Sequence, residues 1–196
     1  MRAFQLLAQP LGVNLLVFIP VGVFIGWRSR GLQISQRQLL FSTLFALAFG
    51  FVEAAVVVYL RAATGLLAGY AGTLSEVQRL GRASALYPPT ITQFPQSLLT
   101  VEVLREGATI VMLVSIALLA AARARERWAL FLWTFALWDI SYYASLWATI
   151  RWPTSPTDLD VLFLIPVPWM AQVWFPLLVS VLTLIAVASS RKQVQV

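Results

Sequence analysis

Long apolar runs separated by short polar segments dominate the pattern along the chain. A helix needs about 20 such residues to cross the hydrocarbon core of a bilayer. The pattern therefore predicts an all-α integral membrane protein, a single polytopic domain over residues 1–196 that forms a bundle of five transmembrane helices. The predicted spans are residues 11–27, 39–60, 101–122, 128–150 and 169–188.

Two longer connections, residues 61–100 and 151–168, fall on the same side of the predicted bundle. In the first, apolar residues from Leu67 to Leu80 recur at helical spacing, which predicts a short amphipathic helix lying on the outer membrane surface. In the second, the apolar stretch 161–168 is too short to span a bilayer. It indicates either a segment that dips into the membrane or packs over the bundle, or an overlong and bent last helix.

Composition agrees with this class, because 60% of the residues are hydrophobic and 11% are charged, against about 45–50% and 25% in soluble proteins. The net charge is +6, and basic residues gather after the first run, between the third and fourth runs, and at the C-terminus. The positive-inside rule then predicts an external N-terminus and a cytoplasmic C-terminus. The strong preference for Arg over Lys favours a GC-rich bacterial genome, and hence a bacterial inner membrane.

The chain contains neither His nor Cys. This excludes disulfides, thiolate nucleophiles, imidazole bases, and haem, iron–sulfur or zinc sites ligated by His or Cys of this chain. A hard divalent cation bound by oxygen atoms remains the candidate cofactor. No basic patch with polar surroundings is present, so nucleic acid is not an expected partner.

Ionisable side chains inside the predicted spans are the main clue to function, since each costs about 2.5–3.5 kcal/mol to insert. Glu102, Arg105, Glu106 and Thr109 share one face of the third span, and Asp139 shares a face of the fourth with two tyrosines. The buried acids all lie in the outer half or the middle of the bilayer. The predicted ion site consists of Glu53, Glu102, Arg105, Glu106, Asp139 and Tyr142, with Arg61, Thr109, Tyr143 and Asp160 as further contributors.

Partners can be predicted for several of these groups. Arg105 is expected to pair with Glu102 or Glu106, which would allow the third helix to insert. Glu53 and Asp139 lack a partner in their own helices and are expected to be protonated or to pair with Arg105 or Arg61. Glu53 lies at the same predicted depth as Glu106, so these two carboxylates are predicted neighbours.

Three classes of function remain open from the sequence. The leading hypothesis is a non-enzymatic membrane protein whose buried site binds or relays a cation or a proton. The second is an accessory subunit of a larger membrane complex, and the third is a membrane-embedded enzyme acting on a lipid or an extracytoplasmic substrate. No residue is assigned a catalytic role. The expected partners are the lipid bilayer and either further copies of the chain or the subunits of a larger complex.

Overall fold

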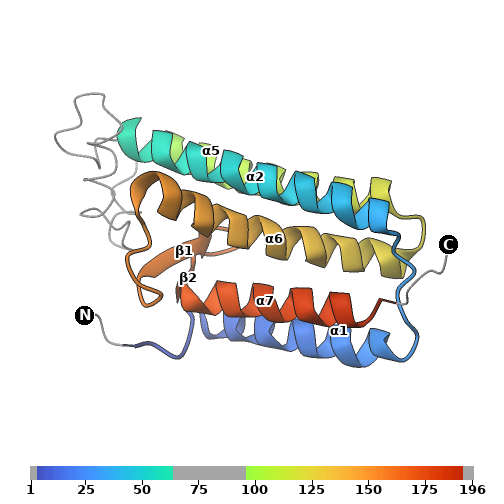
Figure 1. The fold of residues 1–196 in the computed structure, drawn as a ribbon. Helices are drawn as coiled ribbons and strands as arrows, with labels where there is room; N and C mark the ends of the chain where they lie inside the picture. Colours follow the sequence, from blue (N-terminus) through green and yellow to red (C-terminus); the bar gives the residue numbers. More distant parts are fainter. Residues whose placement is uncertain (1–3, 64–95, 192–196) are drawn as a thin grey trace.

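The computed structural model describes residues 4–63 and 96–191, which are mainly helical (Figure 1). The described residues form five α-helices, one 3-10 helix and a two-stranded antiparallel sheet. The helices are η1 (Leu11–Val17), α1 (Phe18–Arg28), α2 (Gln36–Ala63), α5 (Gln96–Ala120), α6 (Ala124–Ile150) and α7 (Trp174–Ser189). The strands are β1 (Leu159–Phe163) and β2 (Trp169–Gln172).

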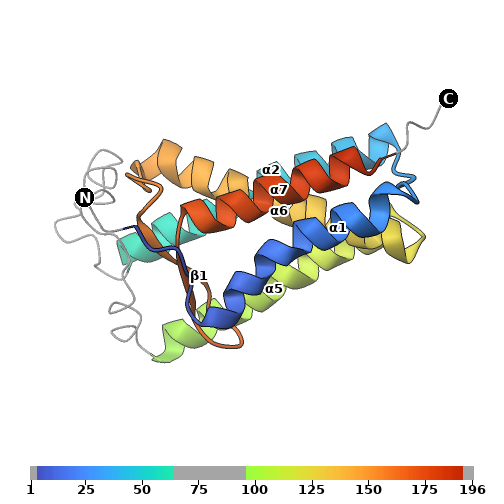
Figure 2. The same cartoon turned by 90° about the horizontal axis from the view of Figure 1, so that it is seen from below.

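The helices run alternately up and down along a common direction (Figures 1 and 2). One end of the bundle, here named the hairpin end, contains β1 and β2 and the starts of α5 and α7. The other, here named the arginine end, contains the end of α1, the start of α2 and the loop between α5 and α6. Its basic residues are Arg28, Arg30, Arg37, Arg123, Arg125, Arg127 and Arg191.

Three segments are long and apolar enough to cross a membrane by length and composition. They are Leu11–Arg28, Gln36–Leu60 and Leu99–Ala120. The central helix α6 packs against α2, α5 and α7, while α1 packs against α7. The neighbours of α6 shield it on several sides, which agrees with its greater content of polar and aromatic residues.

The helices α2 and α6 approach each other closely at Gly50 of α2. A Cβ atom at this position would lie 2.6 Å from the carbonyl oxygen of Trp138 and 2.7 Å from Cβ of Ser141, both on α6. The Ser141 hydroxyl donates a hydrogen bond of 2.8 Å to the carbonyl oxygen of Leu47. A side chain at Gly50 would push the two helices apart, so the small residue is what permits this contact.

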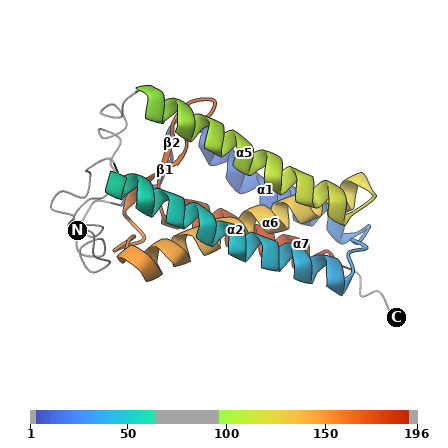
Figure 3. The ribbon, with the colours of Figure 1, turned by 90° about the horizontal axis from the view of Figure 1, so that it is seen from above.

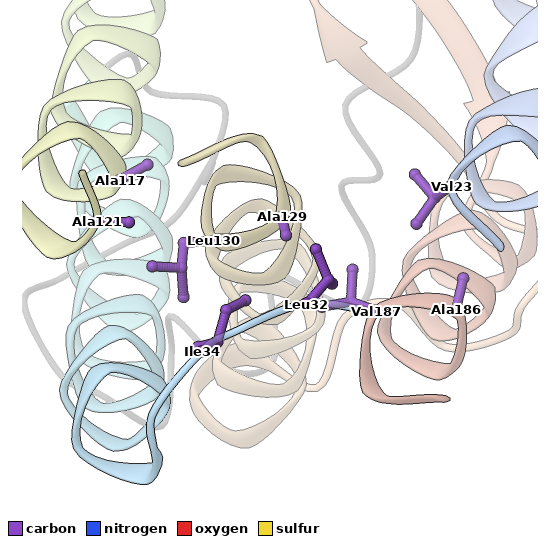
Figure 4. Packing of buried hydrophobic residues seen from close by; sticks show 9 residues of the cluster. All are labelled: Val23, Leu32, Ile34, Ala117, Ala121, Ala129, Leu130, Ala186 and Val187. Atoms are coloured by element: carbon purple, nitrogen blue, oxygen red, sulfur yellow. The ribbon is translucent and has the colours of Figure 1, made fainter. Parts of the chain in front are cut away.

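The arginine end is closed by a compact apolar cluster (Figure 4). Leu32 and Ile34, from the connection between α1 and α2, are 0% and 1% exposed and lie among side chains of α6 and α7. The Leu32 amide donates to the carbonyl oxygen of Ser190 over 2.8 Å, which ties this connection to the end of α7. The other members of the cluster are Val23, Ala117, Ala121, Ala129, Leu130, Ala186 and Val187.

The connection after α6 is not part of an overlong last helix. It packs against the bundle, as one predicted alternative had it, but its β-structure was not predicted. It forms a β-hairpin in which Asp160 pairs with Ala171 and Phe163 pairs with Trp169. The last helix therefore begins at Trp174 rather than at Trp169, and the fold is not purely α-helical. The prolines between Phe163 and Trp169 lack the amide hydrogen that a continuing helix would need, which explains why the chain turns back here.

The hairpin gains a third extended segment from the start of the chain. Gln9 and Met170 exchange two backbone hydrogen bonds of 2.7 Å each. The hairpin lies at the end of the bundle where α5 and α6 diverge (Figures 2 and 3). The amphipathic helix predicted within residues 61–100 lies outside the described residues.

Candidate ligand-binding site

A cavity of about 440 Å³ lies between the hairpin and the helices η1, α1, α2, α5, α6 and α7. Its walls include eight of the ten residues predicted for the ion site, from three helices and one strand. They are Glu53, Arg105, Glu106, Thr109, Asp139, Tyr142, Tyr143 and Asp160. The structure therefore brings together polar residues separated by as much as a hundred positions in the sequence.

Arg105 connects acidic side chains of two helices. Its guanidinium forms ion pairs with Glu53 of α2 and, over 2.8 Å, with Glu102 of its own helix. The hydroxyl of Thr109 lies 2.7 Å from the second carboxylate oxygen of Glu53. Both oxygens of Glu53 are thus hydrogen-bonded to α5, although α2 and α5 make few direct contacts elsewhere.

Glu106 accepts its described hydrogen bonds from backbone amides of the hairpin rather than from a charged side chain. Its carboxylate accepts a hydrogen bond of 2.8 Å from the backbone amide of Leu164, which follows β1. The amide of Ile165 also interacts with this carboxylate. Glu53, the neighbour predicted for Glu106, lines the same cavity, and its described partners on α5 are Arg105 and Thr109. The hairpin, which the sequence did not predict, supplies the donors for Glu106.

Asp139 lies near the middle of α6 and is 8% exposed. Its carboxylate accepts a hydrogen bond of 2.8 Å from the hydroxyl of Ser180 on α7. The predicted alternative, an ion pair with Arg105 or Arg61, is not among the described contacts of Asp139. Ser180 was not predicted as a site residue. The signal for it is a hydroxyl side chain one helical turn from Thr183 in a mainly apolar helix.

Asp160 projects from β1 into the same cavity, where it accepts a hydrogen bond of 2.8 Å from the hydroxyl of Tyr143. Tyr143 interacts electrostatically with both Asp160 and Asp139. The nearby Asp158 has a different role, because its carboxylate accepts hydrogen bonds from the amides of Thr154 and Ser155 in the loop before β1. Asp160 therefore belongs to the cavity, whereas Asp158 closes a loop.

Two predicted residues are placed differently from the other eight. Glu102 is absent from the described walls of the cavity, but it contacts the site indirectly through Arg105. The side chain of Arg61 lies outside what the structure describes, so its predicted contribution stays a prediction.

Aromatic side chains form a large part of the cavity wall, and of these only Tyr142 and Tyr143 were predicted for the site. Phe163 of the hairpin lies 6.1 Å from Phe135 and 5.8 Å from Trp169, measured between ring centroids. On α6, Phe135 lies 5.4 Å from Trp138, which in turn lies 6.2 Å from Tyr142. The hairpin places Phe163 against Phe135 and Trp138 of α6, and Trp169 against Phe163.

Within residues 4–63 and 96–191, no group of three or more acidic residues is arranged to hold a metal ion. The carboxylates are instead distributed around the cavity, each with its own hydrogen-bond donors. The geometry provides oxygen acceptors on several sides of a space much larger than a bare ion.

Comparison with known protein families, characterised proteins and solved structures gives no match to this chain.

Proposed function

We propose that this chain is an integral membrane protein whose five α-helices cross a bilayer. Large apolar side chains on the outside of the bundle support this, including Leu119 at 83% exposure and Ile25 at 71%. Exposed apolar surfaces on this scale favour contact with lipid. The helix α7 has 16 residues and is about 24 Å long, shorter than a hydrocarbon core of about 30 Å, and the hairpin that precedes it would complete the crossing.

The proposed orientation follows from the distribution of basic residues. Seven arginines lie at the arginine end, and the positive-inside rule assigns that end to the cytoplasm. The described N-terminal residues and the hairpin then face outward, and the cavity occupies the outer half of the bundle. With 13 arginines and one lysine, the composition favours the inner membrane of a bacterium.

The proposed function is to bind a cation, or take up a proton, in this cavity. The observation that carries it is the convergence of four carboxylates, from α2, α5, α6 and β1, on one cavity whose described walls contain a single cationic side chain, Arg105. The charge of Arg105 is already matched by Glu53 and Glu102. Glu106 and Asp139 have neutral hydrogen-bond donors instead, so an added positive charge would stabilise them.

Thermal denaturation of the purified protein in lipid nanodiscs tests this function. The midpoint is measured across pH and with a panel of sodium, potassium, magnesium, calcium and small ammonium ions at constant ionic strength. At least one of these cations, or protons, is expected to raise the midpoint. Asp139→Asn and Glu106→Gln are expected to remove that response.

A matched control is Glu126→Gln, which neutralises another buried acid of α6 at the opposite end of the bundle. Glu126 is adjacent to Arg125 and does not line the cavity. The cation response should persist in this variant. A wild-type protein that responds to none of the panel, or a response that both cavity variants retain, would exclude the proposed function.

A further inference from the structure

We infer that the ligand of the cavity is an organic ammonium ion with an apolar body rather than a metal ion. This inference rests on the proposed function, because it specifies which class of cation the site accepts. Three properties of the cavity lead to it: its size, the composition of its walls and the distribution of its charges.

The size of the cavity is that of a small-molecule site. Its volume of about 440 Å³ falls in the range of about 300–1,000 Å³ that is usual for such pockets. A calcium ion needs six to eight oxygen ligands at about 2.3–2.6 Å, and therefore acidic groups that lie close together. The described acids do not form such a group. A metal ion alone would leave most of the space unfilled.

The walls are suited to a bulky cation. Phe135, Trp138, Tyr142, Phe163 and Trp169 all line the cavity, and successive rings lie within 6.2 Å of each other. The faces of aromatic rings attract ammonium groups that have lost part of their hydration, as alkylated ammonium ions do readily. Such rings also pack against the apolar body of a ligand. An inorganic ion with a tightly bound hydration shell gains little from this wall.

The charges indicate where the ammonium group would lie. Asp139 and Asp160 interact electrostatically with each other, and both interact with Tyr143. Their described hydrogen-bond donors are the hydroxyls of Ser180 and Tyr143, which carry no charge. Two carboxylates in one apolar cavity repel each other, and a positive charge near both would remove that repulsion. We therefore assign the ammonium group to the side of the cavity formed by Asp139 and Asp160.

Arg105 and Glu106 line the part of the cavity wall that α5 forms. Arg105 is held by two carboxylates and cannot approach Asp139 without breaking an ion pair. Glu106 is fixed to the tip of the hairpin. The aromatic wall lies beside both regions, so a ligand that places its charge near Asp139 can extend its apolar part along the rings.

The experiment compares two probes of nearly the same shape. Benzyltrimethylammonium carries a positive charge, and neopentylbenzene is its neutral carbon analogue. Binding to the protein in nanodiscs is followed by tryptophan fluorescence, since Trp138 and Trp169 line the cavity, and is confirmed by calorimetry. The ammonium probe should bind saturably and the neutral analogue at least about tenfold more weakly, a difference of about 1.4 kcal/mol.

Three variants locate the site. Asp139→Asn should weaken binding of benzyltrimethylammonium about tenfold, and Asp160→Asn provides an independent test if the first variant folds poorly. Phe163→Leu should weaken the ammonium probe while leaving any response to metal ions or protons unchanged. Glu126→Gln should bind like the wild type.

The outcomes separate this inference from the proposed function. Binding of metal ions or protons alone, lost in Asp139→Asn, would overturn the organic-cation inference and leave the proposed function in place. Equal binding of the charged and neutral probes would also overturn the inference, because it would indicate a purely apolar site. A protein that responds to none of these ligands would overturn both.

Discussion

The two buried acids of α6 differ in what surrounds them, and so do the two ends of the bundle. Glu126 lies in the first turn of α6, where the helix dipole favours a negative charge, and it pairs with Arg125. Asp139 lies near the middle of the same helix, beside a cavity, with the hydroxyl of Ser180 as its donor. An acid placed for structure has its compensating charge nearby, whereas Asp139 has a space beside it where such a charge could bind.

The two ends of the bundle pack differently because their side chains differ in size. At the arginine end, Ala117, Ala129 and Ala186 allow the helices to approach, and Leu32 fills the remaining volume (Figure 4). At the hairpin end, α5 and α6 separate (Figure 3), and a cavity of about 440 Å³ remains between the helices and the hairpin. The same helices therefore form a compact core at one end and a cavity at the other.

The largest expected effect comes from removing the single cation of the cavity wall. Arg105→Gln leaves Glu53, whose side chain is 6% exposed, buried without its ion-pair partner. We expect a loss of about 3–5 kcal/mol in the free energy of unfolding, measured as a large fall in the denaturation midpoint in nanodiscs.

The double variant Arg105→Gln with Glu53→Gln serves as the control for this prediction. It removes both charges and should regain most of the lost stability. If it is as unstable as Arg105→Gln alone, the unpaired carboxylate is not the cause.

A matched pair of leucines on α6 compares the compact core with the cavity wall. Leu130 is 0% exposed in the compact core, whereas Leu132 lines the cavity. Leu130→Ala should cost about 2 kcal/mol, the lower end of the usual range, because lipid replaces water as the solvent and mainly packing is lost. Leu132→Ala should cost less than half as much, since its side chain already borders empty space. Equal shifts in the two midpoints would contradict the contrast in packing.

A further effect is expected at the contact between α2 and α6. Gly50→Ala should destabilise the protein by about 1–3 kcal/mol, because the added methyl group meets the backbone of α6. Gly107→Ala on α5 is the matched control, since a Cβ atom there has nothing within 4 Å. The control should be neutral or stabilising by up to about 1 kcal/mol, as expected for alanine in a helix. Similar losses in both variants would show that helix contact is not the cause.

Much of the helical architecture could be predicted from the spacing of apolar residues. The helix bounds agree within a few residues for the first four predicted spans. The convergence of polar residues on one cavity also follows from their depth, because helices in an antiparallel bundle place residues of equal depth side by side. Membrane insertion and the ion-binding role remain predictions.

The hairpin could not be predicted in the same way. Its strands are only five and four residues long, and the apolar stretch around them matches a buried helix as well as a strand. Without knowledge of the hairpin, the hydrogen bond from the amide of Leu164 to Glu106 cannot be predicted. Backbone donors have no signature in the sequence, so contacts of this kind are visible only in the fold.

The hydrogen bond between Leu164 and Glu106 joins residues that are synthesised at different times. The two residues are separated by 58 positions, and Ser180 follows Asp139 by 41. Ribosomes add about 5–20 residues each second, so the acids of α5 and α6 are synthesised several seconds before their hydrogen-bond donors. During that interval these carboxyl groups must form hydrogen bonds with water or the insertion machinery, or be protonated. The cavity is complete only after α7 has packed against α6.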